Sequence, residues 1–393
     1  MTYLEKLLDG APVEWRPLGE VCKVIRGERV TKKDLVKDGA YPVVSGGAGY
    51  MGFLDRYNRE ACTITVAQYG TAGVLAWQSQ RFWANDVCYS ILPDNSQLNN
   101  KFLYYFLATK QAYIYSRVNR EAYPPSLARK ELLEIEIPLP PLAVQQQIVE
   151  ILDKFTALEA ELEAELEARG RQFRYYRNKL LRFGTTDPNV QWCRLGDIGT
   201  FVRGNGLQKK DFTETGVPCI HYGQIYMYYG MFATETKSFV SEEAALKFKK
   251  AQQGDLIIAT TSENVRDLCK TVVWLGKEEI CISAHSAVFH HYQNPKYLAF
   301  YFQTPWFLKQ KERLAKGTTV IDISVKDLMK IEIPLPPLAV QQQIVAVLNK
   351  FDTLVHSMSE GLPAEIALRR RQYEYYRNLL LRFPPPPYVP HSH

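Results

Sequence analysis

The chain contains an internal repeat, which limits its possible folds more than any other feature. Fifteen consecutive residues, Ile-Glu-Ile-Pro-Leu-Pro-Pro-Leu-Ala-Val-Gln-Gln-Gln-Ile-Val, occur at 135–149 and again at 331–345. A second, more divergent block at 171–183 returns at 371–383, with four additional residues between the two blocks of the second copy. The segments before these blocks are only faintly alike. The chain therefore alternates between variable and constant parts.

Each constant part predicts a long helix with one apolar face. Pro141 is tolerated in a first helical turn, so the first helix should begin near Leu142 and run for about 40 residues. In the second copy, Gly361 and Pro363 predict a break. Apolar residues recur at steps of four and three, the spacing of a coiled-coil seam. The seam residues that we expect to pack are Ile148, Phe155, Leu162, Tyr176, Ile344, Phe351, Met358 and Tyr376.

Such a seam commonly packs a helix onto its own domain. One long helix in each half also allows the two helices to pair, most simply antiparallel, as a spacer between the variable domains. The first residues strengthen this interpretation, because Lys6-Leu-Leu and Trp15 parallel Lys179-Leu-Leu and Trp192. The chain then begins with the end of a constant unit, which predicts a cyclic order with approximate two-fold symmetry and an N-terminal segment close to the helices.

The variable parts are mixed α/β domains with a small positive charge. Residues 15–137 hold 16 Lys and Arg against 12 Asp and Glu, and residues 192–333 hold 18 against 15. Short apolar runs such as 62–66 and 271–275 predict strands, whereas 101–107 and 296–302 predict helices. The expected divisions are an N-terminal helical segment 1–14, a first domain 15–137, a spacer helix 138–186, a second domain 187–333, a spacer helix 334–383 and a disordered proline-rich tail 384–393.

Composition excludes several classes of protein. Hydrophobic residues make up 46% and charged residues 23%, a balance typical of globular proteins. No apolar stretch could span a membrane and the first residues lack a secretory signal, so we expect a cytoplasmic protein without a membrane partner. The seven cysteines are scattered, as is typical of free thiols in a reducing compartment. The net charge of +6 permits an anionic partner without requiring one.

Motifs for catalysis are missing from the sequence. It contains neither a phosphate-binding loop of the form G-x-x-x-x-G-K-[ST] nor a nucleophile elbow. Cys269, Cys281 and His285 offer soft ligands, but they lack the two close pairs that a structural zinc site requires. We therefore expect no catalytic residue, no metal and no cofactor.

Several variable loops place polar and cationic side chains beside aromatic residues and glycines. Arg, Gln, Ser and Thr are among the side chains that read base edges and phosphates, although any one of them is more commonly a solvated surface residue. The candidate DNA-binding residues are Arg56, Arg59, Gln68, Tyr69, Arg117, Arg120, His221, Tyr222, Gln224, Thr260, Thr261, Ser262, Arg266 and Lys316.

Two variable domains, each followed by an Ile-Pro-Leu-Pro-Pro-Leu helix and a Tyr-Tyr-Arg-Asn element, resemble the specificity subunit of type I restriction-modification systems. The resemblance implies two α/β target recognition domains, separated by long antiparallel helices with pseudo-two-fold symmetry. Each domain would read one half of an asymmetric bipartite site in double-stranded DNA. The helices would fix the gap and dock two methyltransferase subunits, to which restriction (translocase-nuclease) subunits add.

The resemblance also implies a non-catalytic subunit, since methylation and ATP-dependent cleavage reside in the partners. Two alternatives remain open from the sequence. A free-standing DNA-binding regulator would also have basic domains, but it would not need two long constant helices. A coiled-coil scaffold would explain the helices, but not the divergence confined to the globular parts.

Overall fold

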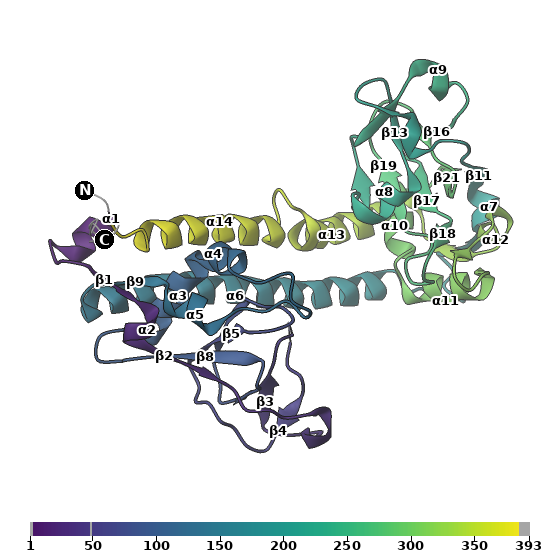
Figure 1. Ribbon diagram of the computed structural model, residues 1–393. Helices are drawn as coiled ribbons and strands as arrows, with labels where there is room; N and C mark the ends of the chain where they lie inside the picture. Colours follow the sequence, from purple (N-terminus) through teal and green to yellow (C-terminus); the bar gives the residue numbers. More distant parts are fainter. Residues whose placement is uncertain (1–2, 48, 385–393) are drawn as a thin grey trace. The chain divides into compact units, whose positions relative to one another are not determined.

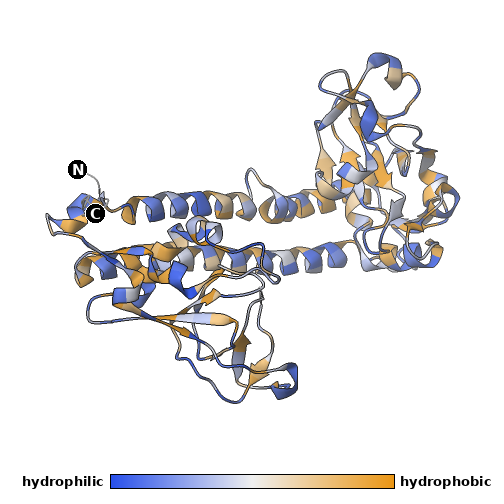
Figure 2. Ribbon diagram, in the orientation of Figure 1, coloured by the Kyte–Doolittle hydropathy of each residue, from blue (hydrophilic) through white to orange (hydrophobic). Residues whose placement is uncertain are grey.

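The structure is a computed structural model that describes residues 3–47 and 49–384. The proline-rich tail expected at 384–393 lies, apart from its first residue, outside the described residues. Hydrophobic residues are concentrated in the strands, such as β17 (Leu256–Ala259) and β19 (Thr271–Trp274), whereas hydrophilic residues cover much of the long helices (Figure 2).

The chain forms two compact units (Figure 1). Unit 1 comprises Met1–Glu161 and Ile366–His393, and unit 2 comprises Leu162–Glu365. Each unit therefore contains one variable segment together with parts of both constant segments. Helix α6 (Leu142–Leu180) contributes its first part to unit 1 and its last part to unit 2.

Unit 1 is built on a four-stranded antiparallel sheet of order β2-β8-β5-β6 and a three-stranded sheet of order β4-β3-β7. Strand β5 is buried along its whole length, as expected for a β-branched central strand. The strands are β1 (Glu14–Pro17), β2 (Cys22–Arg26), β3 (Tyr41–Val44), β4 (Phe53–Leu54), β5 (Thr63–Ala67), β6 (Leu75–Gln78), β7 (Trp83–Ala84), β8 (Cys88–Pro93) and β9 (Glu136–Leu139). The helices of its variable part are α2 (Leu18–Val21), α3 (Asn100–Thr109), α4 (Gln111–Ser116) and α5 (Arg129–Leu133).

Unit 2 has two five-stranded sheets, of order β11-β21-β17-β19-β14 and β12-β15-β13-β20-β16. Its remaining strands form the pairs β18-β22 and β10-β23. The strands are β10 (Gln191–Arg194), β11 (Gly199–Arg203), β12 (Phe212–Thr213), β13 (Val217–Ile220), β14 (Phe232–Ala233), β15 (Ser238–Val240), β16 (Lys249–Ala251), β18 (Thr261–Ser262), β20 (Ile280–Ile282), β21 (Ser286–His291), β22 (Ile321–Asp322) and β23 (Glu332–Leu335). The helices are α7 (Leu195–Ile198), α8 (Tyr222–Met227), α9 (Glu242–Ala245), α10 (Pro295–Tyr301), α11 (Pro305–Leu314) and α12 (Val325–Leu328).

The constant helices begin where the prolines predict. Helix α6 starts at Leu142 and continues for 39 residues. In the second copy, α13 (Leu338–His356) ends before a turn, and α14 (Leu362–Leu380) follows it, so the predicted break is confirmed. Gly361 lies in this turn, where an added Cβ would meet the carbonyl oxygen of Thr353 at 2.3 Å.

The packing seam is less regular than its spacing predicts. Ile148 is fully buried and Ile344 is 7% exposed, while Leu162 is partly exposed. Met358 lies in the turn beyond the end of α13 and is 73% exposed, so the expected seam does not reach it. The helix break removes Met358 from the helical face that its spacing would place it on.

In unit 1, the first part of α6 packs antiparallel to the last part of α14. Phe155 and Tyr376 stack with their ring centroids 5.3 Å apart and an angle of 22° between the rings. One turn further along α6, Glu159 forms an ion pair with Arg370, which precedes Tyr376 in sequence. The two helices therefore run in opposite directions.

Unit 2 repeats this arrangement with the roles of the two copies exchanged. Tyr176 of α6 stacks on Phe351 of α13, with centroids 5.5 Å apart and an angle of 21°. Phe173 and His356 meet edge to face at 5.5 Å, again in antiparallel order. Matching contacts from exchanged copies are what a pseudo-two-fold relation between repeats requires.

A buried glutamine joins each variable segment to its constant helix. Gln145 is fully buried: its Nε2 donates to the carbonyl oxygens of Gln97 and Pro140 at 2.9 and 2.8 Å. Its Oε1 accepts from the backbone N–H of Asn99, the N-cap residue of α3, at 2.7 Å. Gln341 is equally buried and bonds the N-cap residue of α10 in the same way, at 3.1 Å.

The N-terminal segment completes the end of the second constant unit. Leu4 of α1 (Tyr3–Leu8) is buried in the same hydrophobic cluster as Leu380 and Phe383. The Trp15 indole N–H donates to the carbonyl oxygen of Pro384 at 2.9 Å. This reproduces the 3.4 Å bond from Trp192 to the Gly184 carbonyl oxygen in the first copy, so the cyclic order predicted from the N-terminal sequence is confirmed.

Candidate nucleic-acid interface

Three loops of unit 1 meet where strand β5 ends. The backbone of Gln68 accepts from the N–H of Leu127 and donates to the carbonyl oxygen of Val87, both at 2.9 Å. The next residue, Tyr69, forms a bridge with Ser126. Thr71 donates from both its N–H and its hydroxyl to the Gly46 carbonyl oxygen at 2.9 Å, which adds the glycine-rich loop after β3.

The close approach of these loops requires glycine. A Cβ at Gly46 would lie 2.3 Å from the carbonyl oxygen of Tyr69, and Gly70 adopts a φ of +75°. The crossing of two loop backbones therefore explains Gly46 in the sequence run Ser45-Gly-Gly.

Two of the predicted residues of unit 1 belong to this cluster, and two more flank it. Gln68 is partly buried and its Oε1 has no hydrogen-bond partner among the described residues, while Tyr69 is partly exposed. The Arg117 guanidinium contacts the hydroxyl of Tyr113 and forms an ion pair with Glu131, each at 3.2 Å. Arg120 is exposed on the loop between Asn119 and Ser126, which pair with each other.

The other two predicted arginines of unit 1 lie outside this cluster and contact their own domain. Arg59 donates to the Ser90 hydroxyl and to two backbone carbonyl oxygens, at 2.7 to 3.0 Å. These bonds use three of the five guanidinium N–H groups and tie neighbouring segments of the domain together. Arg56 is exposed and lies over the ring of Trp83, 4.7 Å from its centroid.

Unit 2 builds the same junction where β17 ends. Thr260 donates its N–H to the His285 carbonyl oxygen at 2.8 Å and accepts from the N–H of Ile323 at 3.0 Å, so it occupies the place of Gln68. Thr261 pairs with Asp322 as Tyr69 pairs with Ser126. Thr260 is only 3% exposed, and its hydroxyl, like the Gln68 amide oxygen, has no partner among the described residues.

Three predicted residues of unit 2 lie at the start of α8. The His221 Nδ1 accepts from the Gly223 N–H at 3.2 Å, and the His221 N–H donates to Gln224 Oε1 at 2.9 Å. Gln224 also donates to the Ser238 hydroxyl at 2.7 Å. Both side chains therefore cap the helix, whereas Tyr222 is partly exposed, its ring 5.1 Å from that of His285.

Burial keeps the His221 ring neutral at physiological pH. Its side chain is largely shielded, and desolvation lowers the pKa of its imidazole. Lys209 and His285 lower this pKa further by like-charge repulsion. A neutral ring that accepts a backbone N–H acts as a helix cap and carries no charge toward a phosphate.

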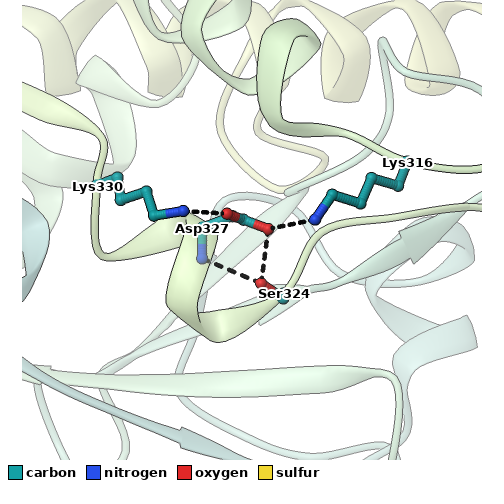
Figure 3. Close-up of polar contacts among 4 residues, drawn as sticks. All are labelled: Lys316, Ser324, Asp327 and Lys330. Atoms are coloured by element: carbon teal, nitrogen blue, oxygen red, sulfur yellow. Dashed lines mark hydrogen bonds and ion pairs between the residues drawn. The ribbon is translucent and has the colours of Figure 1, made fainter.

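An acidic residue anchors Lys316 in unit 2 (Figure 3). Asp327 is 6% exposed and binds Lys330 at 2.7 Å, Lys316 at 3.2 Å and the Ser324 hydroxyl at 2.8 Å. The hydrogen bonds from Lys330 and Ser324, followed by that from Lys316, hold the pKa of this carboxyl well below its usual range. Thr261 and Ser262 form strand β18 beside this loop, and Arg266 is exposed on the loop that follows β18.

The pair Lys316–Asp327 corresponds to Arg117–Glu131 in unit 1. Each acid stands four residues before the repeated fifteen-residue block, at 131 and at 327. This shared spacing is the signal by which the sequence could have revealed the two anchors. Arg117 and Lys316, both predicted to bind DNA, are thus held by equivalent carboxylates beside the loop cluster.

Other reactive side chains are inert or unclustered. Desolvation raises the pKa of the Cys88 and Cys269 thiols to about 12, so they stay protonated at neutral pH. Within residues 3–47 and 49–384, three or more metal-ligating side chains do not come together at any place. The same residues include no helix with the length and apolarity needed to cross a membrane.

Comparison with known proteins identifies a family. A family model described as the type I restriction modification DNA specificity domain matches the chain twice, at residues 12–168 and 189–368. The EcoR124I/EcoR124II specificity subunit of Escherichia coli is 33% identical, over 98% of both chains. A putative type I restriction enzyme specificity subunit of Haemophilus influenzae is 30% identical, over 97% of this chain and 98% of that one.

Solved structures show a similar fold. The S subunit of a type I restriction-modification system from M. genitalium has a TM-score of 0.62 at 18% identity, covering 98% of this chain and all of that chain. A chain from a study of complex assembly in the type I R-M system has a TM-score of 0.60 at 18% identity and covers 95% of this chain and 98% of its own.

Proposed function

Because the chain belongs to the family of type I restriction-modification DNA specificity domains, we propose that it is the subunit of such an enzyme that recognises the DNA sequence. One observation supports this above all. The same framework occurs twice, each copy within its own match to the family model, and each ends in a loop junction whose side chains differ. Unlike side chains on a common framework present unlike hydrogen-bonding groups to two segments of DNA.

Each domain then reads one half of an asymmetric bipartite site in double-stranded DNA. The mild positive charge of both variable segments supplies phosphate contacts, which position the protein without specifying a sequence. Arg56, Arg120 and Arg266 are among the exposed cations that suit such contacts, whereas Arg59 bonds its own domain. The side chains at the loop junctions supply the base contacts.

The constant helices form the surface to which the partner subunits bind. Two equivalent faces related by a pseudo-two-fold axis suit two identical subunits, which we assign as methyltransferase subunits. Restriction (translocase-nuclease) subunits add to these. Methyl transfer and ATP-dependent cleavage belong to the partners, and the assembly works in the cytoplasm, where the host DNA is.

The helices also fix the unread gap between the two half-sites. The four extra residues of the second copy fall beside the turn at 357–361 and do not lengthen a helix, so they leave the gap unchanged. Deletion of residues 358–361 should preserve the gap in the methylated motif. A motif whose gap changes by one or more base pairs would contradict this assignment.

Mapping methylated adenines in host DNA, with and without this gene, tests the function as a whole. We expect one asymmetric bipartite motif to lose its methylation when the gene is removed. An unchanged map in a host with active partner subunits would refute the proposal. Co-purification with a methyltransferase separates it from a free-standing regulator, and a mobility shift with genomic DNA fragments separates it from a coiled-coil scaffold.

A further inference from the structure

Each loop junction projects a short loop, which we call the tip loop. Tip loop 1 comprises residues 119–126 and is closed by pairing of Asn119 with Ser126. Tip loop 2 comprises residues 316–322 and is closed by pairing of Lys316 with Asp322. Ser126 and Asp322 also pair with the residues beyond β5 and β17, so both tip loops are fixed to the ends of buried central strands.

The two tip loops share an exposed apolar side chain. Tyr123 is 102% exposed, the most exposed large hydrophobic residue of the described chain, and Val320 is 62% exposed. A single exposed apolar residue is common on any protein surface and needs no explanation. Its recurrence at the same place in two domains of divergent sequence does need one, because each side chain gains free energy only when something covers it.

The excess of Lys and Arg over Asp and Glu in both variable segments, 16 against 12 in residues 15–137 and 18 against 15 in residues 192–333, favours a polyanion as the covering partner. Within tip loop 1, Arg120 is exposed and stands beside the exposed Glu121. The cations Arg117 and Lys316 are held by Glu131 and Asp327, so the anchored end of each tip loop is fixed while its tip stays open. A preorganised loop loses little conformational entropy on binding.

Resting on the function proposed above, we propose that the two tip loops are equivalent DNA-reading elements, in which Tyr123 and Val320 contact bases of the two half-sites. An aromatic ring can stack on a base or enter a base step, and an apolar side chain can pack against the thymine methyl group. The two tip loops differ in length and composition on matching frameworks, which accounts for two different half-sites read in the same way.

Substitution of the two tip residues in the full chain, assembled with its methyltransferase subunits, tests the assignment. Tyr123→Ala should weaken binding of DNA that carries the native motif by about tenfold or more, the effect of losing one base stack. It should also relax base preference in one half-site only. Val320→Ser should relax the other half-site and leave the first intact. Tyr292→Ala is the matched control, because Tyr292 is 93% exposed outside both tip loops.

A loop exchange provides a second, independent variant. Residues 120–125 are replaced by the Gly-Thr-Thr-Val-Ile sequence of residues 317–321. The exchange should change the methylated motif at one half-site and preserve the melting temperature.

Two results would overturn the assignment in distinguishable ways. If the native complex methylates a bipartite motif and both tip-loop variants keep its affinity and sequence, the tip loops are not reading elements, although the proposed function stands. If the native complex yields no bipartite motif, the proposed function fails and the tip-loop assignment fails with it.

Discussion

Strands β5 and β17 end in the same way, yet the residue that follows is Gln68 in the first domain and Thr260 in the second. The backbone bonds at these two positions match one for one, and so do the bridges at the residues after them. What differs is carried by side chains and by the loops between the matching bonds. The two domains therefore share a backbone framework and differ in the side chains and loops on its surface.

The shared framework predicts that corresponding substitutions destabilise both halves, and the largest losses of unfolding free energy should be at the buried glutamines. Replacing Gln145 or Gln341 by leucine leaves buried backbone groups without partners, so each variant should lose about 2 to 4 kcal/mol of unfolding free energy. The loss should be larger at Gln145, because one partner of Gln341 is the side chain of Gln293, which water can reach.

Urea unfolding followed by circular dichroism measures this loss. Gln147→Leu, in the same glutamine run but on the exposed face of α6, provides the control. Coincident unfolding curves for the variants at Gln145 and Gln147 would contradict the predicted contribution of the buried glutamine to stability.

The stacked rings between helices predict a second pair of matched effects. Phe155→Ala and Phe351→Ala each remove one partner of an equivalent, partly exposed stack, so each should cost about 2 kcal/mol. Thermal melting compared with Lys154→Ala and Lys350→Ala, which alter exposed residues of the same turns, checks the prediction. Unequal losses would show that the two helix pairs are not equivalent.

Lowering the pH should destabilise unit 2 more than unit 1. Burial lowers the pKa of His291 in β21 to about 4, while the corresponding strand β8 ends in Pro93. The unfolded chain takes up this proton first, near pH 6.5, so the stability present above that pH is lost as the pH falls toward 4. Unit 2 should lose about 1 to 2 kcal/mol between pH 7 and pH 5.

Hydrogen exchange resolved by segment measures the acid effect in each unit separately. His291→Asn, which keeps an acceptor for the Gln293 N–H, should reduce the pH dependence of unit 2. An identical pH dependence in the native protein and in this variant would assign the effect to another group.

Substitution of the two anchoring carboxylates, Asp327 and Glu131, should give the smallest losses of unfolding free energy, and the two losses should clearly differ. Asp327→Asn removes a shielded charge held by two lysines, so it should cost about 1 kcal/mol. Glu131→Gln removes a single, more exposed pair with Arg117 and should cost less than about 0.5 kcal/mol. Unfolding in 0.1 and 1 M salt checks both values, and equal losses would contradict the difference in burial.

The sequence predicted the parts of the fold that depend on local rules. Prolines before Leu142 placed the start of α6, and Gly361 with Pro363 placed the break between α13 and α14. The seam was predicted less well, because spacing alone does not tell which residues a partner covers. Val347 and Leu354 follow the same spacing, yet they are 44% and 36% exposed.

The sequence predicted which types of side chain lie in the candidate interface, but it did not predict what each side chain contacts. His221, Gln224 and Arg59 have side chains suited to DNA, but each makes internal bonds that only the folded chain defines. Tyr123 carried no signal, since nothing in a sequence distinguishes an exposed loop tyrosine from a buried one. The sequence indicated which loops contain candidate DNA-binding residues. Only the three-dimensional contacts show which of these residues bond their own domain and which are exposed.

The division of the chain into units also sets an order of events during synthesis. Unit 2 is one continuous stretch, Leu162–Glu365, whereas unit 1 joins Met1–Glu161 to residues that are made only after unit 2. Leu4 and Trp15 leave the ribosome early but must wait for Leu380 and Pro384 before their native contacts can form. The half of the protein that is translated first is therefore the half that finishes folding last.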